Sequence, residues 1–141
     1  MLTDTEHHKP HQSHDHCAVC APIENNPHSL SVHYQQLSDH SIFGEFDVLN
    51  RHQGYTGLLH GGIASSLLDG AMTNCLLLMG VEALTAQLDV RYHAPIALKE
   101  HIEITARCER ERRGVYQLVA QLSVNEEVRV SAMGKFIRPK S

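Results

Sequence analysis

The sequence predicts an α+β fold in which an antiparallel sheet of about six strands wraps around one long central helix. One apolar stretch without proline, residues 57–79, begins with a glycine-rich turn, and from Ile63 onward it has the 3.6-residue period of a helix. Four later segments alternate apolar and polar residues with a period of two, as strands do, and short links join them. Because the expected helix is apolar around most of its circumference, wrapping the sheet around it buries both elements.

The bulk composition limits the classes of function. With 141 residues and 42% hydrophobic content, the chain has the size of one globular domain with a substantial core. Its net charge of −4, with both signs mixed, argues against a nucleic-acid partner, since no dense basic stripe is available for phosphates. The central helix is too short, and carries Asp69 too near its middle, to span a membrane. No secretory signal is recognisable, so we expect a cytoplasmic protein.

Residues 1–27 are expected to form a polar, histidine-rich and partly disordered leader, separate from the domain of residues 28–141. Within the leader, Cys17 and Cys20 have the spacing of metal ligands, and His14 and His16 lie nearby in the sequence. Two interpretations stay open, namely a zinc site and a short segment that packs against the domain without a metal. Because a second cysteine pair is missing, the sequence favours the second, and no metal or cofactor is expected.

The elements of the domain follow in order. Two strands are expected at residues 30–35 and 42–49, and a polar loop then leads into the glycine-rich start of the helix, which Gly80 ends. The short links after the helix favour an antiparallel meander, in which each strand lies beside the next. The four strands of this meander are expected at residues 84–92, 102–109, 116–124 and 128–136.

The start of the helix carries a motif that resembles a known family. His60-Gly61-Gly62 is followed nine residues after the histidine by Asp69, and then by Ala71. This spacing resembles the HGG-x₆-D-x-A signature of hotdog-fold acyl-CoA thioesterases, the PaaI-like branch of the 4-hydroxybenzoyl-CoA thioesterase superfamily. The resemblance implies a hotdog fold, an acyl-CoA substrate that is hydrolysed to the free acid and CoA, and a homodimer that can pair into a homotetramer.

The expected chemistry needs an oxyanion donor and an acid or base group. Gly61 and Gly62 at a helix N-terminus offer backbone N–H groups to an oxyanion, although two glycines also simply permit a sharp turn. Asp69 is the candidate general base or nucleophile, and its alternative is a structural carboxylate satisfied by a serine or threonine of its own helix.

The distance between Gly61 and Asp69 limits how the two groups can act together. Gly61 and Asp69 are eight residues apart, which is about 12 Å along one helix and too far to serve one thioester. The catalytic interpretation therefore requires a dimer in which Gly61 of one subunit lies beside Asp69 of the other.

Further site residues come from the resemblance alone. Gln53 corresponds to a family Gln or Asn that orients water or the thioester, and His60 either bonds the thioester region or fixes the helix entry. Both are placed with Asp69 and Gly61 as catalytic residues. The expected substrate-binding residues are Gly62, Thr85 and Leu59. The competing hypothesis is a non-catalytic hotdog domain that binds or senses acyl-CoA.

Overall fold

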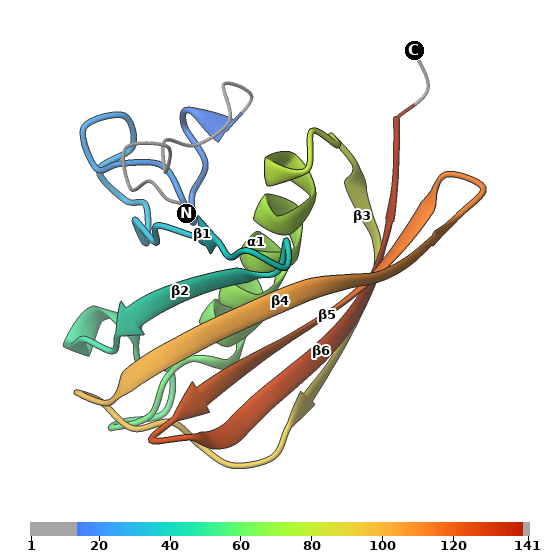
Figure 1. Ribbon diagram of the computed structural model, residues 1–141. Coiled ribbons are helices and arrows are strands. Elements are labelled where there is room, and N and C mark those ends of the chain that lie inside the picture. The colour runs from blue at the N-terminus through green and yellow to red at the C-terminus, as the bar shows by residue number, and fades with distance from the viewer. Residues whose placement is uncertain (1–13, 140–141) are drawn as a thin grey trace.

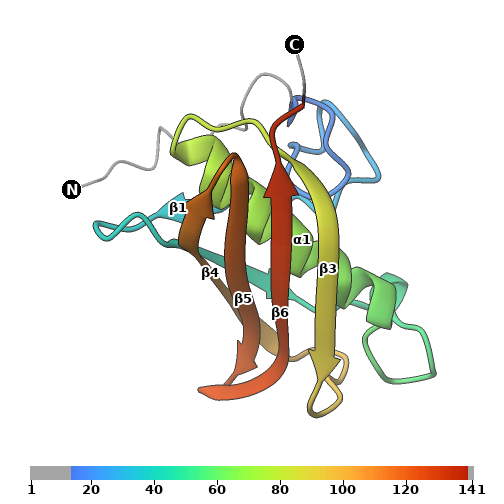
Figure 2. The same cartoon turned by 90° about the vertical axis from the view of Figure 1, so that its right-hand side faces the viewer.

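The computed structural model describes residues 14–139, in which one helix lies across one face of a twisted six-stranded sheet (Figures 1 and 2). The helix, α1, spans Gly61–Leu78, and a short 3₁₀ helix, Asn50–His52, precedes the loop that leads into it. The strands are β1 (Gln35–Gln36), β2 (Ile42–Asp47), β3 (Leu84–Tyr92), β4 (His101–Arg112), β5 (Val115–Val124) and β6 (Glu127–Ile137). The predicted α+β fold, with its sheet around one central helix, is confirmed.

The order of the strands differs from the predicted meander. All neighbouring strands are antiparallel, in the order β1-β2-β4-β5-β6-β3. The meander is right for β4, β5 and β6, and wrong for β3, which pairs with β6 at the edge of the sheet (Figure 2). The physical reason is the connection from β3 to β4, residues 93–100, which is too long for a tight hairpin and takes the chain across to β2.

The first predicted strand is also corrected. Regular pairing with β2 is limited to Gln35–Gln36, so residues 30–34 are not part of the sheet. They run instead along the leader, and the Val32 N–H donates to the Val19 carbonyl at 2.9 Å. The left-handed φ of 57° at Ser31 interrupts the extended backbone that a strand requires.

Two layers cover α1. On one side its apolar residues pack into the core under the sheet; those that are fully buried and largest are Leu67, Leu68, Met72 and Leu76. On another side the leader lies against Gly70, where an added Cβ would come within 2.7 Å of Val19 Cγ1. The Tyr34 hydroxyl donates to the Leu67 carbonyl at 3.0 Å beside this contact. The predicted boundary between residues 27 and 28 stays a prediction, and residues 1–13 lie outside the described residues.

The end of α1 agrees with the sequence. Gly80 adopts a left-handed φ of 82°, its N–H donates to the Leu77 carbonyl, and the Val81 N–H donates to the Leu76 carbonyl. This pair of hydrogen bonds satisfies carbonyls that the helix leaves unpaired, and glycine adopts the required φ without steric cost.

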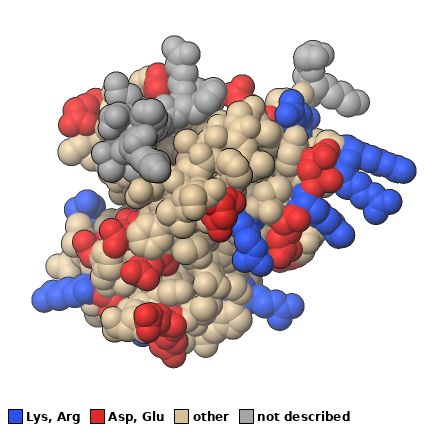
Figure 3. Space-filling model, viewed as in Figure 1, with Lys and Arg blue, Asp and Glu red and all other residues tan. Residues whose placement is uncertain are grey.

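The charged surface is mixed on the face drawn in Figure 3, where basic side chains stand beside acidic ones. No helix within residues 14–139 has both the length and the apolar character that crossing a membrane demands.

Candidate active site

The first turn of α1 leaves one backbone donor available. His60 is the N-cap of the helix, and its Nδ1 accepts a hydrogen bond from the Gly62 N–H at 2.8 Å. The His60 carbonyl accepts from the Ile63 and Ala64 N–H groups, each at 3.1 Å. Within residues 14–139, no acceptor lies at the Gly61 N–H, which is exposed at the positive end of the helix. Of the two glycine amides, the one without an acceptor among the described residues is that of Gly61, and it is the amide that can bind a ligand.

Tyr92 fixes this turn from β3, and the sequence analysis missed it. Its hydroxyl donates to the Gly61 carbonyl at 2.8 Å and accepts from the Ser65 hydroxyl at 2.7 Å. A Cβ on Gly61 would lie 3.5 Å from this hydroxyl, which is an ordinary contact. In the sequence, Tyr92 is only the last residue of an alternating segment; its contact with α1 depends on where β3 lies in the sheet.

The loop before α1 places two more of the predicted residues at the same end of the helix. The Gln53 side-chain carbonyl accepts a hydrogen bond from the Gly57 N–H at 2.9 Å, and Gln53 forms an isolated bridge with Leu59. The Leu59 N–H donates to the Ile96 carbonyl at 2.8 Å, in the connection between β3 and β4. The helix entry is therefore supported by a segment that lies far away in the sequence.

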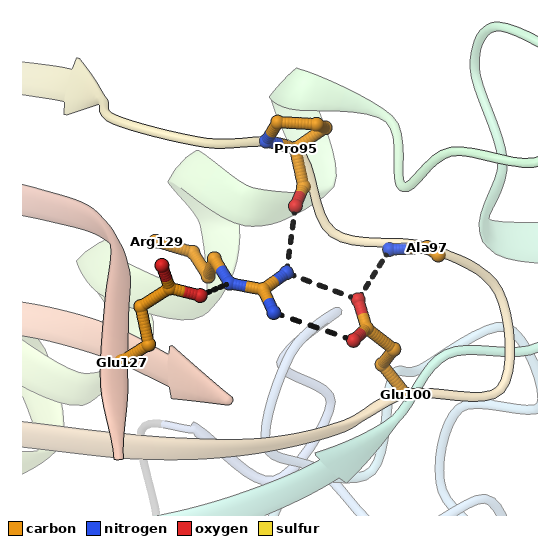
Figure 4. Close-up of polar contacts among 5 residues, drawn as sticks. All are labelled: Pro95, Ala97, Glu100, Glu127 and Arg129. Atoms are coloured by element: carbon orange, nitrogen blue, oxygen red, sulfur yellow. Dashed lines mark hydrogen bonds and ion pairs between the residues drawn. The ribbon is translucent and has the colours of Figure 1, made fainter. Parts of the chain in front are cut away.

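Arg129 of β6 holds that connection in place (Figure 4). Its guanidinium donates to the Pro95 carbonyl at 2.8 Å, to both Glu100 carboxylate oxygens at 3.1 and 3.4 Å, and to Glu127 at 2.6 Å. The Ala97 N–H donates to Glu100 at 2.7 Å. The hydrogen bond from Ala97 and the contact with Arg129 lower the pKa of Glu100, so the carboxylate stays charged. This group of residues fixes the backbone on which the helix entry rests.

Two adjoining pockets open at the Gly61 end of α1. One has a volume of about 430 Å³ and is lined by the preceding loop, including Tyr55 and His60. The other has a volume of about 310 Å³ and is lined mainly by apolar groups, among them Ile96 and Val130. Gly61 borders both pockets, so a group bound in either one can reach its free N–H.

Asp69 lies about two turns further along α1, half-buried, and its partner comes from the sheet. Its Oδ1 accepts a hydrogen bond from the Thr85 hydroxyl of β3 at 2.7 Å. The serines of its own helix bond elsewhere, since Ser66 donates to the Gly62 carbonyl at 2.9 Å and Ser65 to Tyr92. One oxygen of the carboxylate is thus oriented by Thr85.

The predicted site residues form two groups within one chain. The group at the start of α1 comprises Gln53, Leu59, His60, Gly61 and Gly62. The second group comprises Asp69 and Thr85. Eight residues of continuous helix separate Gly61 from Asp69, which is about 12 Å.

Comparison with known proteins gives a consistent result. The family model of the thioesterase superfamily matches residues 56–130. No curated protein matches the chain.

Solved structures share the fold along most of the chain. One thioesterase superfamily protein is 29% identical with a TM-score of 0.81; the match covers 86% of this chain but only 63% of that one. A hypothetical thioesterase of Streptococcus pneumoniae, solved with coenzyme A, is 18% identical with a TM-score of 0.72. The match covers 78% of this chain and 90% of that one. A phenylacetic acid degradation-related protein of Ralstonia eutropha is 20% identical with a TM-score of 0.71. The match covers 83% of this chain and 92% of that one.

The hotdog fold of these thioesterases is therefore also the fold of this chain. The family match spans more than half of the sequence and includes the helix start, Asp69 and β3 through β5. The chain belongs to the thioesterase superfamily.

Proposed function

We propose that the protein hydrolyses acyl-CoA thioesters to the free acid and CoA, in an active site shared between two subunits. The observation that carries this proposal is the pair of groups on the exposed side of α1. The Gly61 N–H lacks an acceptor within residues 14–139. Asp69 lies eight residues further along the helix, and Thr85 orients its carboxylate. One is an oxyanion donor and the other a base, the two functions that thioester hydrolysis requires.

In the proposed reaction, Asp69 acts first on water. The carboxylate takes a proton as the water oxygen attacks the thioester carbonyl, and the Gly61 N–H stabilises the oxyanion that forms. The tetrahedral intermediate then collapses, the C–S bond breaks, and CoA leaves as a thiolate that takes up the proton held by Asp69, which regenerates the carboxylate. In the alternative route, the Asp69 carboxylate itself attacks the thioester carbonyl and displaces the CoA thiolate. The mixed anhydride that forms is hydrolysed by water in a second step.

The shared site follows from distance, and the exposed side of α1 supports it. Most of the residues of α1 that remain exposed or half-buried have small side chains, namely Gly61, Gly62, Ser65, Ser66, Asp69 and Thr73; the exceptions are Ile63 and Leu78. A second α1 can therefore approach closely in antiparallel orientation. β3 lies at the edge of the sheet, with Leu84 66% exposed, so pairing of β3 with its copy would bring the two helices together.

The proposed substrate binds at the Gly61 end of the helix. The apolar wall of the 310 Å³ pocket, including Ile96 and Val130, fits an apolar acyl group. A structural relative has been solved with coenzyme A, which supports a CoA thioester as the ligand class. Gln53, His60, Gly62, Thr85 and Leu59 complete the proposed site as the residues that shape it.

The test compares thiol release from a panel of acyl-CoAs by the wild type and two variants. Asp69→Asn removes the base, and we expect a loss of about 10²-fold or more in kcat. Gly61→Pro removes the N–H and adds a ring at the first helical position, where proline is well tolerated; a similar loss of about 10²-fold is expected. Gly61→Ala is the matched control, since its Cβ fits beside Tyr92 and its N–H remains.

Equal rates for the wild type and Asp69→Asn would contradict the role given to Asp69. Wild-type protein that binds acyl-CoA and releases no thiol across the whole panel would instead favour a binding or sensing domain.

A further inference from the structure

Three potential metal ligands converge in the leader, away from the proposed thioesterase site. The Nδ1 or Nε2 atom of His14 and the Sγ atoms of Cys17 and Cys20 all lie within 4.8 Å of one another. Cys20 Sγ is 3.5 Å from His14 Nδ1, and Cys20 is only 3% exposed. His14 and Cys17 are half-buried. The sequence places histidines near the two cysteines, and the structure brings His14 to them as a third potential ligand.

The backbone around these side chains is held in a fixed shape. The N–H groups of Val19 and Cys20 donate to Cys17 Sγ at 3.3 and 3.4 Å, so the sulfur is oriented by its own turn. Hydrogen bonds of this kind orient metal ligands in many sites.

Two asparagines brace the residues between the ligands. Asn25 donates to the Asp15 carbonyl at 2.8 Å, and Asn26 donates to the His16 carbonyl at 3.1 Å. These two hydrogen bonds hold the backbone between His14 and Cys17 without using the ligand side chains.

We propose that His14, Cys17 and Cys20 bind one zinc ion, with a water molecule in the fourth position. Two thiolates and an imidazole are a donor set that zinc prefers, and zinc accepts tetrahedral coordination by three protein ligands and water. Hard cations such as magnesium and calcium require oxygen ligands, which this cluster does not present.

The place of the site in the fold suggests what the ion does. Val19, between the two cysteines, packs on Gly70, and Gly70 is the residue that follows Asp69 on α1. Zinc bound by His14, Cys17 and Cys20 would fasten the leader to the helix that carries Asp69. The role is structural, and it does not depend on the reaction proposed above.

The first test measures metal in untagged, full-length protein after dialysis against a moderate chelator. We expect about one zinc per chain in the wild type. His14→Ala, Cys17→Ser and Cys20→Ser should each lose most of it. His28→Ala and Cys108→Ser are the matched controls, because they remove a histidine just after the leader and a cysteine of β4, both outside the cluster, and both should retain the metal.

A measurement without mutation covers the case in which a variant fails to fold. Reduced, metal-free wild type is titrated with cobalt(II), and thiolate-to-cobalt charge transfer with the visible bands of tetrahedral coordination should saturate at one equivalent. Zinc should displace the cobalt. Saturation without a thiolate band would place the metal on other histidines and overturn the proposal.

Amide hydrogen exchange tests the structural role. The Leu30 N–H donates to the Ala18 carbonyl and the Val32 N–H to the Val19 carbonyl, so their protection reports whether the leader stays paired with residues 30–32. Removing zinc should speed exchange at these two amides about tenfold or more, while amides of β5 stay unchanged. Zinc below about 0.1 per chain after reduction and reloading would overturn the site, whatever the thioesterase activity. Unchanged exchange in a zinc-loaded protein would overturn the fastening role.

Discussion

At the residue scale, Gly70 shows how the leader limits the composition of the central helix. Glycine in a helix interior ordinarily costs about 1 kcal/mol relative to alanine, so Gly70→Ala would stabilise an exposed helix. Here the added Cβ would lie 2.7 Å from Val19 Cγ1 and 3.1 Å from the Tyr34 hydroxyl. Overpacking of this kind costs about 1–3 kcal/mol, so we expect a net decrease in the free energy of unfolding, measured by urea denaturation.

A second substitution tests the cause of that decrease. Val19→Ala in the Gly70→Ala background removes the closest atom and should recover part of the lost stability. If Gly70→Ala is as stable as the wild type, the leader does not pack on α1 as described.

His52 makes the stability of the helix entry depend on pH. It is 4% exposed, and its Nδ1 accepts a hydrogen bond from the Leu49 N–H at 2.9 Å. Burial, with a smaller effect of Arg51, lowers the pKa of His52. The pKa of His52 in the folded protein therefore lies below the unfolded value of about 6.5. The contribution of neutral His52 to the free energy of unfolding is fully present above about pH 6.5, and it is lost as the pH falls through the folded pKa.

We expect the free energy of unfolding of the wild type to fall between about pH 7.5 and 5.5, and to fall less in His52→Gln. The measurement is urea denaturation of both proteins at each pH. The difference between them isolates His52 from the other histidines, including His101, whose pKa is raised by Asp47 and Glu45 and which acts in the opposite sense. An identical pH dependence in both proteins would contradict this account.

At the scale of elements, the connection from β3 to β4 is held by Arg129. The side chains of Arg129 and Glu100 are 14% and 27% exposed, and Arg129→Met would leave Glu100 without its charged partner. We expect Arg129→Met to lower the free energy of unfolding by about 2–3 kcal/mol, measured by denaturant titration.

Arg107→Met is the matched control for that prediction. Arg107 pairs with Glu109 at 3.2 Å, but these side chains are 65% and 37% exposed. Exposed pairs contribute little, so the control should change stability by no more than about 0.5 kcal/mol. Equal effects of the two substitutions would show that Arg129 is not a special anchor.

At the scale of the whole molecule, the proposed shared site makes a prediction about mixed dimers. Asp69→Asn and Gly61→Pro should each be inactive as homodimers. A mixed dimer has one site that combines the intact Gly61 of one subunit with the intact Asp69 of the other, so half of its sites work. After random exchange in an equal mixture, about a quarter of all sites should be active, measured as recovered thiol release.

Two variants that remain inactive after verified subunit exchange would contradict a shared site. Exchange is verified with an affinity-tagged copy of one variant, which must co-purify the untagged other variant.

The sequence determines the local elements well, because their signals act between neighbouring residues. The apolar period determined α1, and Gly80 its end. The alternation of apolar and polar residues located β3 through β6 to within a few residues. The spacing from His60 to Asp69 indicated the family, and the match of the family model to residues 56–130 confirms it.

Tertiary structure decided which of these elements meet. The alternation of apolar and polar residues shows which residues of a strand face the core, but it does not show which strand lies alongside. The pairing of β3 with β6 could therefore not be predicted from the sequence. For the same reason, the partner of Asp69 is Thr85 of β3 and not a serine of its own helix, and Tyr92 reaches Gly61. These contacts join residues far apart in the sequence, and the periodicity of neighbouring residues carries no information about them.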